Sequence, residues 1–299
     1  MSCVIRTRDL SKKFRNTAVL DRLNLEVPAG SIYGLVGPNG AGKTTTIKVL
    51  MNIYPPSSGH SEILDTDSRR ISPAQLAQIG YVSENQEMPG WMTVQYFMDY
   101  LSNFYPTWDR LLAADLLRQF ELPLHRKLRH LSHGMRMKAA LASSLAYRPR
   151  LMVLDEPFTG LDALIRDELI EGILTRAENT TIFISSHDLT EIESFASHIG
   201  YLDNGRLQFS EDMDSLRARF REITLTFDRV PQFPSPWPSG WLRPQKDGAV
   251  MQFIETEFDP ERTAAAVRRI FPELRDMTAS PMPLRSIFVT LAKVGRTTV

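Results

Sequence analysis

The feature that most constrains the fold is a glycine-rich loop near the N-terminus. Its residues read Gly37-Pro38-Asn39-Gly40-Ala41-Gly42-Lys43-Thr44 and match the phosphate-loop pattern at every fixed position. An apolar run, residues 31–36, precedes the loop, and apolar side chains at helical spacing follow it to residue 51. The pattern predicts a strand, a loop and a helix in that order, as the motif requires.

The residue types of this loop suit a triphosphate. Glycine N–H groups can close around phosphate oxygens at a helix N-terminus, and Lys43 adds a positive charge that we also expect to act in catalysis. The hydroxyl of Thr44 can ligate magnesium. A turn that only joins a strand to a helix is the competing interpretation, but the Lys-Thr pair and the flanking elements disfavour it. We expect nucleotide binding by Gly37, Pro38, Asn39, Gly40, Ala41, Gly42, Lys43, Thr44 and Thr45.

Two acids follow a second apolar run. Residues 151–154 predict a buried strand, and Asp155 and Glu156 come directly after it. Ligands of open α/β sheets bind at the carboxyl ends of parallel strands. Asp155 therefore suits magnesium, and Glu156 could orient a water toward a terminal phosphate. Such a pair can also be a solvated strand end, but a preceding phosphate loop favours catalysis.

A histidine follows a third apolar run. Residues 181–186 predict another strand, and His187 comes next, where it could reach the same edge of the sheet. A single histidine at such a position is more often structural, so the residue pattern alone leaves its role open.

Composition excludes several classes of protein. Lys plus Arg and Asp plus Glu both number 35, so no overall positive field attracts nucleic acid. Cys3 is the single cysteine, which excludes an intrachain disulfide and favours a cytosolic location. The first residues lack the apolar core of a signal peptide, and no run reaches 18 uncharged apolar residues. If this chain works at a membrane, we expect it to do so from outside the bilayer.

The order of the patterns predicts an α/β fold: a phosphate-loop NTPase core with an N-terminal antiparallel β layer, a helical subdomain insertion and a small C-terminal α+β appendix. Residues 4–27 contain short β-prone stretches that end in a half-buried strand at 23–27. The insertion spans about residues 86–131, and a helix is expected at 189–195. The Asn204-Gly205 pair predicts a hairpin. We place the main domain at residues 1–221 and the accessory domain at 222–299.

These motifs together resemble the nucleotide-binding subunits of ATP-binding-cassette (ABC) transporters, of the bacterial exporter-like type. The resemblance covers residues 4–207, with the motifs in the family's order. It includes Leu131-Ser132-His133-Gly134-Met135-Arg136, which is similar to the family's signature Leu-Ser-Gly-Gly-Gln. The resemblance implies Mg²⁺-dependent hydrolysis of ATP between two cassettes that face each other head to tail. The loop of Lys43 in one cassette would then share ATP with Ser132 and Gly134 of the other.

Other positions take roles from the same resemblance. Asp162 lies in the loop that crosses the dimer interface, His187 would contact the terminal phosphate, and Phe14 would stack on adenine. The family's lid glutamine normally follows the strand predicted at residues 79–82. Here Glu84 occupies that position and Gln86 comes two residues later, so either side chain could reach magnesium or water.

The resemblance also implies partners. A separate transmembrane permease subunit would dock on the helical insertion, and the second cassette would be an identical or a related chain; no nucleic acid is expected. The chain would be cytoplasmic and attached peripherally to the membrane, with export favoured. The alternatives are a soluble ABC ATPase outside transport and a regulatory ATP-binding cassette. Candidates for an exposed docking patch are Trp91, Met92, Val94, Tyr96 and Phe97, although core packing is the usual fate of most such residues.

Overall fold

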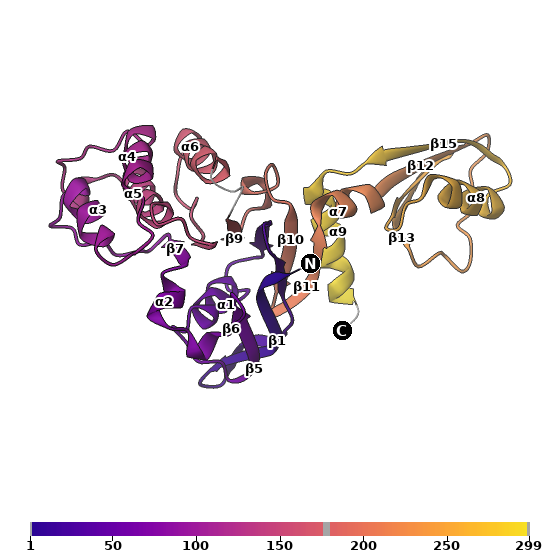
Figure 1. Cartoon of the computed structure of the whole chain (residues 1–299). Coiled ribbons are helices and arrows are strands. Elements are labelled where there is room, and N and C mark those ends of the chain that lie inside the picture. The colour runs from indigo at the N-terminus through magenta and orange to yellow at the C-terminus, as the bar shows by residue number, and fades with distance from the viewer. Residues whose placement is uncertain (1, 176–179, 298–299) are drawn as a thin grey trace. The chain divides into compact units, whose positions relative to one another are not determined.

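The computed structural model describes residues 2–175 and 180–297. The chain contains two compact units, residues 1–210 and 211–299, whose elements are labelled in Figure 1. The boundary between functional domains that we expect at residues 221 and 222 stays a prediction. No helix in the two described ranges is both long and apolar enough to cross a membrane.

An antiparallel sheet forms the N-terminal layer of the first unit. Its strand order is β2-β1-β5-β6, and β3 also pairs with β1. The strand expected at residues 23–27 is interrupted, because the amide of Leu25 donates to the Thr7 hydroxyl instead of continuing β2. The strands are β1 (Cys3–Phe14), β2 (Thr17–Leu23), β3 (Glu26–Pro28), β5 (Ser58–Ile63) and β6 (Thr66–Asp67).

A second sheet carries the strands that precede the candidate site residues. Its order is β11-β10-β4-β9-β8-β7, and from β10 to β7 neighbouring strands are parallel. Asn204 and Gly205 both have positive φ and form the predicted turn between β10 and β11. The strands are β4 (Ile32–Val36), β7 (Ile79–Ser83), β8 (Leu151–Asp155), β9 (Thr181–Ser186), β10 (His198–Asp203) and β11 (Arg206–Asp212).

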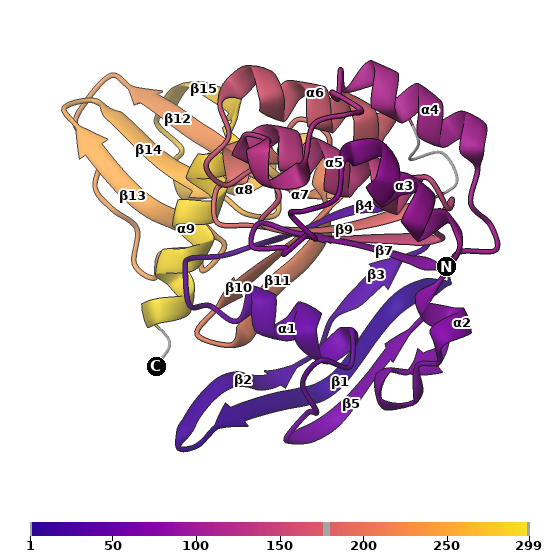
Figure 2. The same cartoon turned by 90° about the vertical axis from the view of Figure 1, so that its left-hand side faces the viewer.

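Helices cover both faces of the parallel sheet. Figure 2 shows α1 between the two sheets and the helices α3 to α6 on the other side of the parallel sheet. Apolar residues of α1, including Ile47 and Leu50, are buried in one cluster with residues of both sheets. The α-helices of this unit are α1 (Lys43–Leu50), α2 (Pro73–Leu76), α3 (Val94–Ser102), α4 (Arg110–Gln119), α5 (His133–Leu145) and α6 (Ala163–Leu174).

Polar side chains begin the helices on that outer side. Thr93, Asp109, Ser132 and Asp162 each accept a backbone N–H as the N-cap of α3, α4, α5 and α6. The expected helical insertion is thus present, with a short 3₁₀ helix η2 (Leu128–His130) before α5. Two further 3₁₀ helices are η1 (Ser68–Arg70) and η4 (Leu189–Glu191).

The prediction of a helix at residues 189–195 is wrong. A single 3₁₀ turn, η4, forms there, and the backbone leaves helical values at Ile192, where φ is −123°. The apolar spacing of this segment is compatible with a helix, but Ile192 is fully buried in this irregular turn instead.

The second unit contains its own antiparallel sheet, in the order β13-β14-β12-β15. Strand β12 lies between β14 and β15 and pairs antiparallel with both, so β14 and β15 are parallel to each other. Helix α8 connects these two strands. Its core includes Trp241 stacked on Phe253, with ring centroids 4.2 Å apart. The elements are α7 (Met213–Arg219), β12 (Arg221–Phe227), β13 (Trp241–Asp247), β14 (Val250–Glu255), α8 (Pro260–Ile270), β15 (Leu274–Pro281) and α9 (Leu284–Thr297).

Candidate nucleotide site

The glycine-rich loop connects β4 to α1, and two of its glycines are required by geometry. A Cβ atom at Gly37 would lie 2.1 Å from the carbonyl oxygen of Leu202, so only glycine allows this close approach. Gly42 is the N-cap of α1 and has a φ of 110°, which side chains disfavour. The loop therefore ends with the N–H groups of a helix N-terminus, a favourable position for an anion.

Lys43 is the first residue of α1, and its ammonium group folds back over the loop. Nζ donates to the carbonyl oxygens of Gly37, at 2.7 Å, and Pro38, at 3.2 Å. It also lies 3.0 Å from Oε1 of Glu156, and the Lys43 side chain is only 5% exposed. The charge is thus held in place by oxygen atoms on several sides.

Asp155 lies at the end of β8, and its carboxylate is hydrogen-bonded to the start of α1 and to β9. Oδ1 accepts hydrogen bonds from the hydroxyls of Ser185, at 2.7 Å, and Thr44, at 3.0 Å. Burial raises the pKa of Asp155, and these two hydrogen bonds oppose that rise. The Asp155 carboxylate and the Thr44 hydroxyl are hard oxygen donors of the kind that Mg²⁺ prefers, so the pair fits this ion.

Glu156 has a left-handed backbone conformation, with φ at 52°, directly after the strand. Its Oε2 accepts hydrogen bonds from Nδ1 of His187, at 2.8 Å, and from the His187 backbone N–H, at 3.2 Å. Burial alone would raise the pKa of Glu156, but the hydrogen bonds from His187 and Lys43 outweigh it and lower the pKa. The carboxylate is therefore kept ionised.

His187 follows β9 and faces the same carboxylate. Its hydrogen bond with Glu156 raises the pKa of the imidazole, against a smaller opposing effect of burial. The structure thus joins three residues that the sequence had suggested separately: Lys43, Glu156 and His187.

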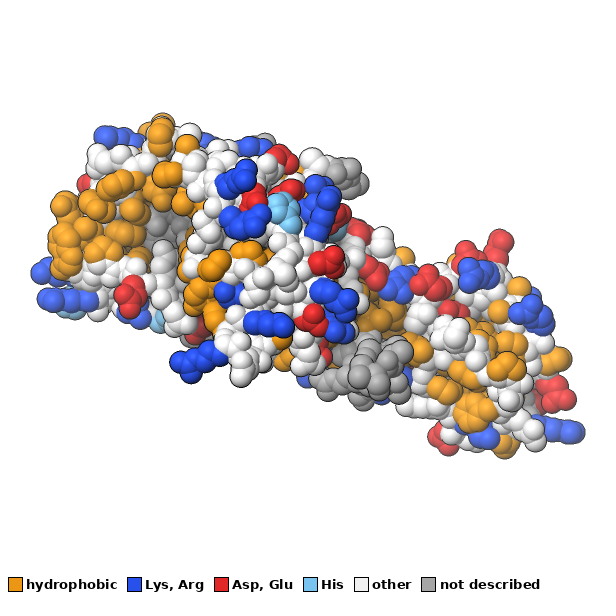
Figure 3. Space-filling model, turned by 90° about the horizontal axis from the view of Figure 1, so that it is seen from below, with side chains coloured by type: hydrophobic (Ala, Val, Ile, Leu, Met, Phe, Trp, Pro, Cys, Tyr) orange, Lys and Arg blue, Asp and Glu red, His pale blue; other side chains and the backbone are white. Residues whose placement is uncertain are grey.

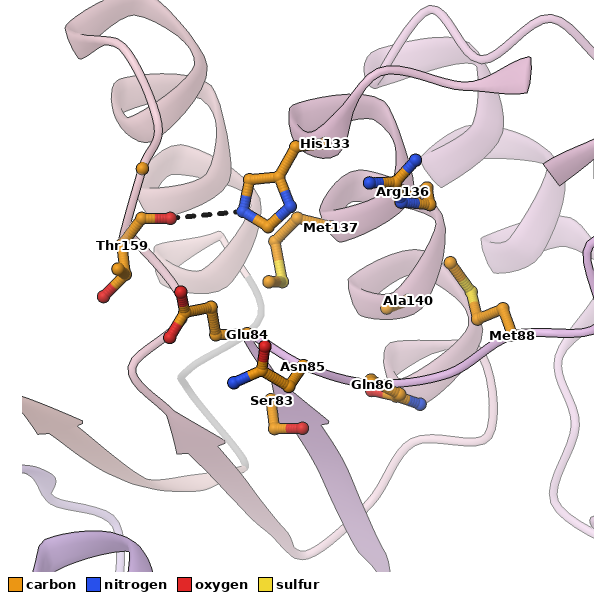
Figure 4. A pocket seen from close by; sticks show the side chains of 11 residues that line it. Ser83, Glu84, Asn85, Gln86, Met88, His133, Arg136, Met137, Ala140 and Thr159 are labelled. Carbon is orange, nitrogen blue, oxygen red and sulfur yellow. Dashed lines mark hydrogen bonds between the residues drawn. The ribbon is translucent and has the colours of Figure 1, made fainter. Parts of the chain in front are cut away.

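These side chains surround a cavity of about 460 Å³. The described residues that line it are Val19, Asn39, Gly40, Gly42, Lys43, Thr44, Thr45, Glu84, Glu156, Thr159 and His187. Glu84 lies on this cavity, whereas Gln86 lines an adjoining cavity of about 510 Å³ together with Glu84 (Figure 4). The structure thus separates the two lid candidates, with Glu84 on the side of Lys43.

Other expected site residues lie outside this cavity. Ser132 and Asp162 are exposed helix caps, and Gly134 is buried where a Cβ would lie 2.9 Å from the Ile165 side chain. Phe14 is 39% exposed and packs edge-on against Tyr54. None of these is among the described residues that line the cavity, so their assigned roles stay predictions.

Sequence reasoning missed two residues that support the site. Ser185 holds both acids, because its hydroxyl donates to Asp155 and accepts the backbone N–H of Glu156. Its place at the carboxyl end of a predicted strand was a usable signal. The Thr159 hydroxyl lies 3.4 Å from Glu156 Oε2, and nothing in the local sequence pattern marks Thr159.

The helical insertion presents exposed apolar side chains, which Figure 3 shows on one face of the molecule. Trp91 is 60% exposed and Tyr96 50%, while the neighbouring candidates Met92, Val94 and Phe97 are buried, as expected for most of the set. Further exposed apolar residues of this region are Tyr100, Phe104 and Leu111.

The fold and the site define a class of protein. A parallel sheet with a phosphate loop after its central strand, and an acid pair and a histidine at neighbouring strand ends, is the arrangement of a phosphate-loop ATPase. The antiparallel sheet and the helical insertion restrict the chain to a smaller group within the phosphate-loop ATPases.

Comparisons with known proteins identify the family. A family model described as ABC transporter matches residues 20–159. The chain is 32% identical over 227 residues to the ABC transporter ATP-binding protein YtrB of Bacillus subtilis, covering 75% of this chain and 77% of that protein. It is 33% identical over 243 residues to the bacitracin transport ATP-binding protein BcrA of Bacillus licheniformis, covering 74% of each chain. The chain belongs to the ATP-binding subunits of ABC transporters, which bind and hydrolyse ATP.

Solved structures agree with this assignment. The structure of an ATP-binding subunit of an ABC transporter matches with a TM-score of 0.66 at 27% identity, covering 72% of this chain and 92% of that one. A dimeric bacterial ABC transporter cassette matches with a TM-score of 0.62 at 22% identity, over 70% of this chain and 98% of that one, and shows the shared fold. The fold class predicted from sequence is thus confirmed. Cassettes of this family form dimers and work with membrane permease subunits.

Proposed function

We propose that this chain is the cassette of an exporter, in which Glu156 orients the water that attacks the terminal phosphate of ATP. The observation that carries the proposal is the contact of one carboxylate with both Lys43 and His187. Lys43 would neutralise phosphate charge, and His187 would hold Glu156 ionised and face the terminal phosphate. The names of the relatives, which include a bacitracin transport protein, favour export.

Magnesium would be held by Thr44 and Asp155, with Glu84, which lines the same cavity as Thr44, as the lid residue. When bound, the ion would neutralise charge on the phosphate oxygens. Thr45 and the loop residues other than Pro38, which has no backbone N–H, would bind phosphate through backbone N–H groups, and Phe14 would contact adenine.

Two cassettes, identical or related, would close on ATP, with Ser132, Gly134 and Asp162 of each facing the nucleotide of the other. Hydrolysis would let them part, because closure depends on differential binding of ATP and ADP. A separate permease would take up this motion through the exposed aromatic residues Trp91 and Tyr96, at the cytoplasmic face of the membrane. Residues 1–221 would form the ATP-binding domain, and 222–299 an accessory domain.

The test is magnesium-dependent ATPase activity of the purified chain beside Glu156→Gln, with size-exclusion chromatography of both in ATP. We expect the variant to lose about 10²–10⁴-fold in turnover, because the water loses its general base, and to accumulate as a dimer in ATP. Glu171→Gln, an exposed glutamate of α6, is the matched control. Normal turnover of Glu156→Gln would refute the assignment, and a parent chain inactive alone would indicate an obligatory related partner.

A further inference from the structure

The side chain of His133 connects two segments that the sequence separates. His133 is the first residue of α5, and its Nε2 lies 3.2 Å from the carbonyl oxygen of Thr159, in the loop before α6 (Figure 4). Because a carbonyl oxygen only accepts, Nε2 carries the proton and donates it. A glycine at position 133, the usual residue of the family's signature, has no side chain to make this bond.

The imidazole also covers the turn that follows Thr159. Gly160 has a φ of 72°, and the nearest atoms to a Cβ built there are Cδ2 and Nε2 of His133, at 3.9 and 4.0 Å. A second contact joins α5 to α6 itself, because Gly134 packs against Ile165. The start of α5 therefore contacts both the loop before α6 and the first turn of α6.

The start of α5 and the loop before α6 each contain an exposed residue that caps a helix. Ser132 immediately precedes His133 and caps α5, and Asp162 follows Gly160 by two residues and caps α6. The His133–Thr159 bond thus limits how far Ser132 and Asp162 can move relative to each other. The same residue, Thr159, also donates its hydroxyl to Oε2 of Glu156, at 3.4 Å.

We propose that His133 is a positioning residue that holds Ser132 and Asp162 as one unit. This rests on the proposed function, in which both residues face the ATP of the partner cassette. His133 then prepares the surface that closes on the partner's nucleotide, while Thr159 steadies the carboxylate of its own site. The histidine at position 133, where the family's signature usually has glycine, then has a function in this chain.

The bond itself is tested by hydrogen exchange of the loop, residues 156–162, in chains without nucleotide. His133→Gly removes the side chain, His133→Leu keeps bulk without a donor, and His133→Gln keeps an N–H donor. We expect exchange to rise about fivefold in the Gly and Leu variants, equivalent to about 1 kcal/mol for one hydrogen bond, and to be partly restored in the Gln variant. Equal exchange in all three variants and the parent would overturn the proposal, whether or not the chain dimerises.

The positioning role is tested by ATPase activity of mixed dimers, purified through two different tags, in which Lys43→Ala disables one nucleotide site. In a head-to-tail dimer the remaining ATP faces Ser132 of the Lys43→Ala chain. Relative to the mixed dimer that carries Lys43→Ala alone, His133→Gly should therefore lower turnover about fivefold when placed on that same chain, and leave it nearly unchanged when placed on the other chain.

Thr159→Val provides the matched contrast, because it removes the hydroxyl at Glu156 but keeps the carbonyl that accepts from His133. It should lower turnover only when placed on the chain with intact Lys43. Equal losses in both arrangements for His133→Gly would indicate a merely structural role and overturn the proposal. Inactivity of the mixed dimer that carries Lys43→Ala alone would instead contradict the proposed function, and hydrogen exchange would still decide the bond.

Discussion

The ammonium group of Lys43 lies 3.0 Å from a carboxylate oxygen of Glu156, and both side chains are largely buried, at 5% and 14% exposed. One residue begins α1 and the other follows β8, so the contact forms only when the parallel sheet is complete. Buried charges need partners, and this pair supplies them to each other. The same contact brings together the cation that we propose binds phosphate and the acid that we propose orients water.

Lys43→Ala should weaken nucleotide binding by about tenfold or more, since charge-assisted hydrogen bonds contribute about 1.5–3 kcal/mol each. Binding of a fluorescent ATP analogue measures the change. Lys48→Ala, in the same helix, makes the same change of charge where the ammonium lies near Tyr54, and should bind almost as the parent does. Equal affinity of the parent and Lys43→Ala would contradict a phosphate-binding role.

The two lid candidates should differ in magnesium dependence. Glu84→Ala is expected to raise the Mg²⁺ concentration for half-maximal ATPase activity, because it removes a carboxylate from the cavity that contains Thr44. Gln86→Ala should change this concentration much less, since Gln86 lines the adjoining cavity. A larger effect at Gln86 would reverse the assignment.

Acid should remove a stabilising contribution of Asp109. The backbone N–H of Leu112 and the guanidinium of Arg148 lower the pKa of this carboxyl. A lowered folded-state pKa means that the contribution is present above the unfolded value, about 3.9, and is lost as pH falls through the folded value. Asp109→Ala should therefore lower the Tm at pH 7, and its difference from the parent should shrink in acid.

Calorimetry at a series of pH values measures this difference. Asp115→Ala, an exposed position on the same helix, is the control and should lower the Tm less at neutral pH. A difference for Asp109→Ala that stayed constant into strong acid would exclude the ionised carboxylate as its source.

Phe253→Ala should destabilise the second unit by about 3–5 kcal/mol, the usual range for a buried phenylalanine. Phe253 stacks on Trp241, so denaturant unfolding followed by tryptophan fluorescence reports this loss. Phe233→Ala changes the same residue type at a position 46% exposed and should be close to neutral. Similar losses in both variants would argue against the core described for this unit.

Local patterns were sufficient for much of the candidate site. The phosphate loop is continuous in sequence, and its glycines act through their own backbone, so position and geometry were both readable. Asp155, Glu156 and His187 were identifiable because each follows an apolar strand, and the carboxyl ends of parallel strands meet at one edge. The prediction of a helix at residues 189–195 failed, although its apolar residues have helical spacing, because Ile192 is buried in an irregular turn.

By itself, the sequence determined most of the order of strands, loops and helices, the candidate residues for phosphate binding and the family resemblance, because these depend on neighbours along the chain. The tertiary structure alone decided which side chains meet: Ser185 beneath both acids, Glu84 rather than Gln86 on the cavity with Lys43, and His133 on the carbonyl of Thr159. The physical reason is that these contacts depend on strand order and helix packing, which bring together side chains distant in sequence.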